Sequence, residues 1–249
     1  MTPRGSPLAQ WNIAVGNFFF RYRNALFPSI IVVTVLFLRP RIILGNPALD
    51  QLLGLCGAAI ALAGEAVRLT TIGFEYIERG GKEGKVYASK LVQGGVYALT
   101  RNPMYVGNAM IAIGIAMVTG TPGAYLVLIP LFLFIYQAIV AAEEAYLRPR
   151  FGRDYDEYCA KVPRFLPSLR RVPQAFAGMR YNWKRALRQD LSTIIGLSFG
   201  LALLPFWRLI FLQGFDAAKQ AAPLALLQSA VILAVYSLLY RMKKRGQLH

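Results

Sequence analysis

The sequence predicts an all-α membrane protein: a polytopic bundle of about six transmembrane helices with short amphipathic helices on the cytoplasmic side. Hydrophobic residues make up 56% of the 249 positions, and the mean hydropathy is positive, which exceeds the usual apolar content of a soluble domain. Long apolar runs recur along the chain, and basic residues gather between them. Anionic lipid headgroups are the expected counter-charge for the net charge of +16, so we predict membrane lipids, and not nucleic acid, as partners.

The N-terminal region is predicted to contain one interfacial segment and one span. Residues 1–24 include an apolar, aromatic stretch that is shorter than the roughly 20 residues needed to cross a bilayer, so we expect it to lie at the interface. Residues 25–38 carry no charge and form the first span. This span extends to Leu44 if Arg39 and Arg41 snorkel to the headgroups.

The second span is predicted over residues 48–70. Its small and charged residues Gly57, Ala61, Glu65 and Arg68 fall at i, i+4, i+8 and i+11, on one helical face. Small residues let helices approach closely, and charges inside a membrane face the bundle interior. Glu65 and Arg68 then form either a structural ion pair or a wall of a functional cavity.

The third and fourth spans are predicted to form a helical hairpin. A polar loop rich in glycine and charge covers residues 71–100, and spans follow at 104–120 and 122–142. A tight turn, Gly120-Thr-Pro-Gly123, joins them. The start of the third span and the end of the fourth therefore lie on the same side of the membrane.

The C-terminal region is predicted to add a basic linker and two more spans. Residues 143–190 contain 11 Lys and Arg residues, and apolar runs follow at 191–212 and 222–240. Because cytoplasmic loops carry the excess of positive charge, we predict a multi-pass protein with both termini on the cytoplasmic side. Arg39 and Arg41 oppose this orientation locally.

Two polar clusters lie where predicted spans reach that cytoplasmic side. Arg101-Asn102-Pro103 begins the third span, with Pro103 well placed for a first helical turn. A helix N-terminus beside an arginine suits a carboxylate, although Arg101 alone is equally suited to anchoring a span to headgroups. The pair Glu143-Glu144 closes the fourth span, where two adjacent acids repel unless a cation or a donor-rich ligand is near.

A short amphipathic helix is predicted to cover these clusters. After Glu144 the chain is polar, and Tyr155, Tyr158, Cys159 and Val162 share one helical face. We expect this helix to lie over the cytoplasmic opening of the bundle.

Four motifs in order resemble a known family. The chain carries G-x-Y-x-x-x-R-N-P-x-Y-x-G at 95–107, E-E at 143–144, F-G-x-x-Y-x-x-Y at 151–158 and V-P-x-x-x-P at 162–167. This order is similar to the membrane methyltransferases typified by isoprenylcysteine carboxyl methyltransferase and phosphatidylethanolamine N-methyltransferase. The resemblance covers about residues 91–167 and continues more weakly through the second predicted span.

The resemblance implies methyl transfer from S-adenosylmethionine to a lipidic or isoprenoid-bearing acceptor that arrives laterally from the bilayer. The cofactor would lie between the start of the third span and the acidic pair, under the amphipathic helix. The chemistry of the residues agrees, because the cofactor's sulfonium, ammonium and carboxylate call for acidic, basic and aromatic partners. The implied catalytic residues are Arg101 and Glu144. The implied cofactor-binding residues are Tyr97, Arg101, Asn102, Pro103, Tyr105, Gly107, Glu143, Glu144, Tyr155 and Tyr158.

One position departs from the family pattern. Asn102 stands where the family most often has histidine, and an amide cannot take up a proton near pH 7. His249 is the only histidine, so no internal imidazole base exists. A carboxylate or neutral amine acceptor is therefore favoured over an alcohol, and we expect no metal site.

The predicted organisation has three parts: the interfacial segment 1–24, a methyltransferase core at 25–167, and a linker with two additional spans at 168–249. Two other functions stay open. A membrane sterol-type reductase would use NADPH on a similar helical core. A transporter or scaffold would use the last two spans and bind no cofactor.

Overall fold

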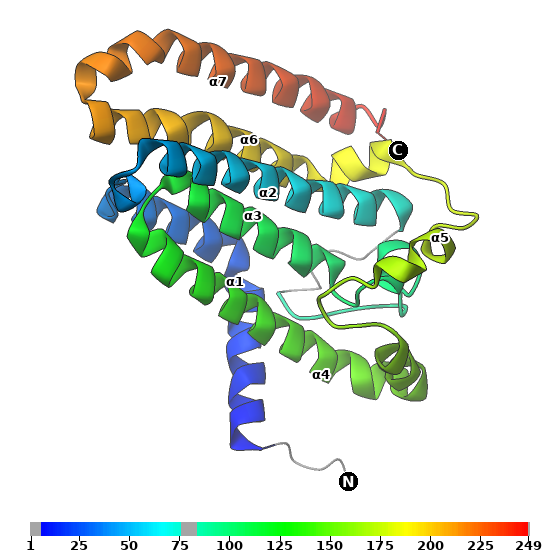
Figure 1. The fold of residues 1–249 in the computed structure, drawn as a ribbon. Helices are drawn as coiled ribbons and strands as arrows, with labels where there is room; N and C mark the ends of the chain where they lie inside the picture. Colours follow the sequence, from blue (N-terminus) through cyan, green and yellow to red (C-terminus); the bar gives the residue numbers. More distant parts are fainter. Residues whose placement is uncertain (1–5, 76–83, 249) are drawn as a thin grey trace.

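The computed structural model describes residues 6–75 and 84–248, and every regular element in these ranges is helical. The long helices pack side by side as a bundle, with α1 crossing the others at an angle (Figure 1). Five helices are long and apolar enough to cross a membrane, and α3 is a shorter apolar helix. The predicted polytopic helical bundle is confirmed. Five of the six predicted spans correspond to helices of spanning length, and the remaining one corresponds to the shorter α3. The helices of the bundle are α1 (Pro7–Phe37), α2 (Pro47–Phe74), α3 (Pro103–Thr119), α4 (Ile129–Lys161), α6 (Trp183–Gln213) and α7 (Phe215–Lys244).

Helix α1 is continuous from Pro7 to Phe37, with no break between the predicted interfacial segment and the first span. Ser6 caps its N-terminus, and Pro28 is accommodated inside it. The helix ends at Phe37 and does not reach Leu44. The backbone N–H of Arg41 instead donates to the Gly120 carbonyl at 3.0 Å, so this segment packs against the turn between α3 and the next helix.

Helices α2 and α3 approach each other through glycines spaced seven residues apart on each helix. Added Cβ atoms at Gly57 and Gly64 would lie 2.7 Å and 2.6 Å from the carbonyl oxygens of Gly114 and Gly107. The predicted face of α2 is therefore the packed one, and Glu65 and Arg68 are buried on it. Contact this close stabilises a membrane bundle through van der Waals packing.

We expect Gly114→Ala to destabilise the protein by about 1–3 kcal/mol, because overpacking forces the two backbones apart. The new Cβ would lie 2.4 Å from the Gly57 carbonyl oxygen. Thermal unfolding in detergent measures the effect. Gly196→Ala in α6 is the matched control, because an added Cβ there meets nothing within 4 Å, and helix propensity alone should give a gain of about 0.5–1 kcal/mol. Equal shifts for the two variants would contradict this account of the α2–α3 contact.

The fourth predicted span begins with a π-helical turn, Ala124–Leu128 (η3), and continues into α4. The helix does not end at Glu143-Glu144, as the sequence pattern suggested, but runs on to Lys161. It bends at Gly152, whose φ of 51° and ψ of −125° lie outside the helical region. Glycine adopts this conformation without a steric cost, so the bend redirects residues 153–161 across the end of the bundle (Figure 1).

Helices α6 and α7 form a hairpin that packs on α2 through α6 (Figure 1). Asn182 caps α6, so the helix begins at Trp183, earlier than the predicted span at 191. The guanidinium of Arg185 donates to the carbonyls of Ile72 and Gly73 at 2.8 Å and 2.7 Å. These bonds satisfy carbonyl groups at the C-terminus of α2 that have no partner within the helix.

Two buried ion pairs join α2 and α6 with opposite polarity. Arg68 of α2 pairs with Asp190 of α6, and Asp50 of α2 pairs with Arg208 of α6. Each helix thus contributes one acid and one arginine, 18 positions apart, so the pairs match only when the helices run antiparallel in this register. The α6–α7 hairpin is fixed to the bundle at both ends of α6.

Short elements complete the fold: η1 (Ile43–Gly45), η2 (Gly95–Ala98), η4 (Leu169–Arg171) and α5 (Val172–Ala175).

Candidate functional site

The two polar clusters meet where α3 begins and α4 approaches its bend. Arg101 Nη1 lies 3.3 Å from Glu144 Oε1, which confirms that both clusters emerge on the same side of the bundle. Arg164 also reaches Glu144, with Nε 3.0 Å from Oε1 and Nη2 2.9 Å from Oε2. Glu144 is therefore held between two guanidinium groups, one of them bidentate, which is the stronger geometry for such pairs.

The loop before α3 is fastened to the loop after α4. The N–H of Arg101 donates to the Pro163 carbonyl at 2.9 Å, and Thr100 Oγ1 donates to the Arg164 carbonyl at 3.2 Å. The Asn102 side-chain amide donates to the same carbonyl at 2.9 Å. This position therefore works as a donor to the backbone, which asparagine can do as well as histidine.

Glu143 faces a different partner from Glu144. Tyr105 of α3 donates its hydroxyl to Glu143 Oε1 at 2.5 Å, and its ring lies 5.9 Å from the ring of Tyr136, centroid to centroid. A short hydrogen bond to a carboxylate is a strong one. The adjacent acids thus avoid mutual repulsion because each has its own donor.

Tyr155 and Tyr158 lie on the helical segment beyond the bend, which contacts the ion-paired Arg101 through Cys159. Beyond the bend they are 2% and 5% exposed and form a buried cluster with Val162. The Tyr158 hydroxyl donates to the Tyr97 carbonyl at 2.7 Å, so this segment, residues 153–161 of α4 and called the covering helix below, is tied to the loop before α3 through the Tyr97 backbone. A helix therefore lies beside the Arg101–Glu144 pair as expected, and its location on the cytoplasmic side stays a prediction.

Gly107 lies one turn deeper in α3, in the contact with α2. A Cβ there would lie 2.6 Å from Arg68 Cγ and 2.7 Å from the Gly64 carbonyl oxygen. The structure therefore gives Gly107 a packing role, and its predicted cofactor contact stays a prediction.

Two residues near Arg101 were missed by the sequence reasoning. Arg164 lies inside the V-P-x-x-x-P motif. The signal that could have identified it is its positive charge, because the acidic pair Glu143-Glu144 called for a nearby cation. Cys159 was placed on the covering face, but its Sγ accepts a hydrogen bond from Arg101 Nη1 at 2.6 Å. Arg101 Nε is buried and has no hydrogen-bond partner among residues 6–75 and 84–248. A buried donor left unpaired is rare in proteins, and this one is consistent with a ligand that accepts hydrogen bonds from Arg101.

Comparison with known proteins identifies a matching family and several relatives. Residues 55–154 match the family model described as phospholipid methyltransferase. The resemblance to this methyltransferase family is confirmed. The matched residues take in most of α2, all of α3 and α4 as far as its bend, so they include Arg101 and Glu144 but not Arg164.

Individual relatives match over a similar length. A protein-S-isoprenylcysteine O-methyltransferase of Schizosaccharomyces pombe is 36% identical over 77 residues, which is 31% of this chain and 33% of that protein. A probable protein-S-isoprenylcysteine O-methyltransferase of Oryza sativa subsp. indica is 35% identical over 78 residues, 31% of this chain and 41% of that protein. The cobalt-zinc-cadmium resistance protein CzcN of Cupriavidus metallidurans is 33% identical over 79 residues, 32% of this chain and 36% of that protein.

The matches therefore span about a third to two fifths of the length of these relatives. No solved structure matches the chain. The α6–α7 hairpin lies outside the family match.

Proposed function

We propose that this protein transfers a methyl group from S-adenosylmethionine to a lipidic or isoprenoid-bearing acceptor at the membrane. The observation that carries the proposal is the cluster of Arg101, Glu144 and Arg164 with the unpaired Arg101 Nε. S-adenosylmethionine supplies the electrophilic methyl group, on its sulfonium. The family match and the names of the two O-methyltransferase relatives support the proposal.

The site residues fit the charges of this cofactor. Arg101 would bind its carboxylate through Nε and orient it. Glu143 and Glu144 would face its cationic groups. On binding, Glu144 would give up its contact with one arginine and form a contact with the ammonium instead. Tyr155 and Tyr158 would close the site with aromatic surface, which attracts a cation. Contact between the cofactor and the rest of the predicted set, from Tyr97 to Gly107, belongs to the same proposal.

Acceptor chemistry follows from the residues that are absent from the sequence. The only histidine is His249, so a carboxylate or a neutral amine, which reacts without a strong base, is the proposed nucleophile. The site would act mainly by aligning the nucleophile with the methyl group while water is excluded, and positioning can supply about 7 kcal/mol or more. The acceptor would enter from the bilayer, with the site on the cytoplasmic face. The names of relatives favour a carboxylate, and the family name is compatible with an amine.

Titration of the purified protein in detergent with S-adenosylhomocysteine tests the proposal. We expect saturable binding to the native protein and a loss of about tenfold or more in Arg101→Ala, because each hydrogen bond to a charged group is worth about 1.5–3 kcal/mol. Arg148→Ala is the matched control, since its exposed ion pair with Asp156 lies outside the cluster. Absence of binding by the native protein would overturn the proposal. Binding of NADPH in its place would favour a reductase.

A further inference from the structure

A groove on the surface lies beside the proposed methyltransferase site and shares none of its charged residues. Its volume is about 560 Å³, and it is lined by the covering helix, the loop before α3 and residues 171–175. Tyr158 and Val162 form part of its wall, whereas Arg101, Glu144 and Arg164 do not. The groove is therefore a separate feature from the Arg101–Glu144–Arg164 cluster.

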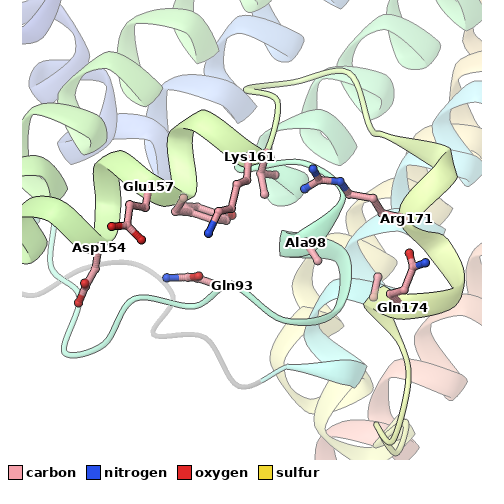
Figure 2. Close-up of a pocket in the computed structure, with 10 residues that line it drawn as sticks. Gln93, Ala98, Asp154, Glu157, Lys161, Arg171 and Gln174 are labelled. Carbon is pink, nitrogen blue, oxygen red and sulfur yellow. The ribbon is translucent and has the colours of Figure 1, made fainter.

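The charges around the groove are separated along its length. Figure 2 shows Asp154 and Glu157 toward one end, Arg171 and Gln174 toward the other, and Lys161 between them. No hydrogen bond or ion pair joins the Lys161 or Arg171 side chain to another residue within the described ranges. Lys161 and Arg171 thus place two positive charges on the groove that no carboxylate neutralises by direct contact within the described ranges, so both are available to an anion. At the other end Glu157 accepts a hydrogen bond from Arg153 Nε at 2.8 Å, and together with Asp154 it offers further carboxylate acceptors to a ligand that donates hydrogen bonds.

Apolar side chains beside the cations indicate where such a ligand comes from. Leu166, Leu169 and Val172 are 84%, 73% and 38% exposed, in the same loop as Arg171. Exposed leucines next to basic residues are typical of a segment that enters the membrane interface. Trp183, at the start of α6, is also exposed, as expected for an aromatic residue at headgroup level.

We propose that this groove binds the phosphate headgroup of a phospholipid. The phosphate lies between Lys161 and Arg171, and hydroxyl groups at the far end of the headgroup donate to Asp154 and Glu157. The acyl chains follow the apolar side chains of residues 166–172 into the bilayer. A water-soluble phosphate ester shares the headgroup chemistry but gains nothing from that apolar loop. This binding is independent of methyl transfer and of S-adenosylmethionine.

Calorimetric titration in a maltoside detergent tests the proposal, with dihexanoyl phosphatidylglycerol as the probe. Dihexanoyl phosphatidylcholine, whose quaternary ammonium donates no hydrogen bond, and glycerol 3-phosphate are the comparison ligands. We expect phosphatidylglycerol to bind most tightly, and Lys161→Gln and Arg171→Gln each to weaken it about tenfold or more, as for the loss of one charge-assisted contact. Arg170→Gln is the matched control, because Arg170 is the exposed neighbour of Arg171 and does not line the groove.

Several results would overturn the proposal. Equal weakening in Arg170→Gln would show diffuse attraction to a basic surface, and equal affinity for glycerol 3-phosphate would show a soluble anion as the ligand. Absence of phosphatidylglycerol binding would remove the site. If the glutamine variants do not fold, the native protein is photo-crosslinked in vesicles that contain a photoactivatable phosphatidylglycerol. The labelled residues then show whether the groove binds this lipid. Labelling must then fall within residues 154–175, and labelling confined to other regions would overturn the proposal.

Discussion

Replacing Glu144 with glutamine should abolish detectable methyl transfer and weaken S-adenosylhomocysteine binding by about 100-fold. Glu144 accepts from both Arg164 and Arg101, and all three side chains are less than a third exposed. In the proposed complex Glu144 also faces the ammonium of the cofactor, and truncating one partner of such a partly buried charge pair costs about 2–3 kcal/mol of binding after allowance for partial exposure. Because each 1.4 kcal/mol is a factor of ten in affinity, calorimetric titration of the variant resolves the effect.

Asp156→Asn is the matched control for this prediction. Asp156 lies on the covering helix and pairs with Arg148, but both side chains are about 60% exposed, so its loss should change affinity and unfolding temperature little. A lowered unfolding temperature in Glu144→Gln without a loss of cofactor affinity would assign Glu144 a structural role and contradict the prediction. A measurement at two salt concentrations adds a check, since partly buried pairs are screened less than exposed ones.

The inward face of α2 was predictable because a membrane leaves charged residues few choices. Glu65 and Arg68 had to face the interior, and Gly57 and Ala61 share their face by helical periodicity alone. The structure confirms that face, and Arg68 Nε lies 3.5 Å from Glu65 Oε2. Helix ends were less predictable. In α4 the apolar run stops near Glu143, but hydropathy does not distinguish the end of a helix from its exit into the interface.

The composition of the site was predicted better than its pairing. Arg101 and Glu144 met as expected, since a tight turn places the start of one hairpin helix beside the end of the other. Arg164 was missed because its position depends on the bend at Gly152, which nothing in local periodicity reveals. Asp50 and Arg208 were missed for a different reason. They lie near the ends of their helices, where a charged side chain can also reach the headgroups, so their sequence position does not distinguish a buried pair from two interfacial residues.

Replacing Asp190 with alanine should destabilise the protein by about 3–5 kcal/mol, as expected when one partner of a buried ion pair is removed. Asp190 is fully buried, and Arg68 is 4% exposed. Arg68 Nε donates to Asp190 Oδ2 at 3.0 Å, and Nη2 donates to Thr193 Oγ1 at 3.0 Å. Without the carboxylate, the guanidinium keeps its charge in the bundle while losing its main acceptor. Thermal unfolding in detergent, at matched protein and detergent concentrations, measures the loss.

The double variant Arg68→Met with Asp190→Leu separates the ion pair from simple packing. Replacing both charges with apolar residues removes the uncompensated charge, so the double variant should recover part of the stability that Asp190→Ala loses. Recovery should be incomplete, because Arg68 also pairs with Glu65. Limited proteolysis gives the second readout. The Asp50–Arg208 pair still holds the far end of α6, so cleavage in Asp190→Ala should increase first near residues 176–190. Cleavage spread evenly over the chain would instead show global unfolding and contradict the view that the two pairs fix α6 independently at its two ends.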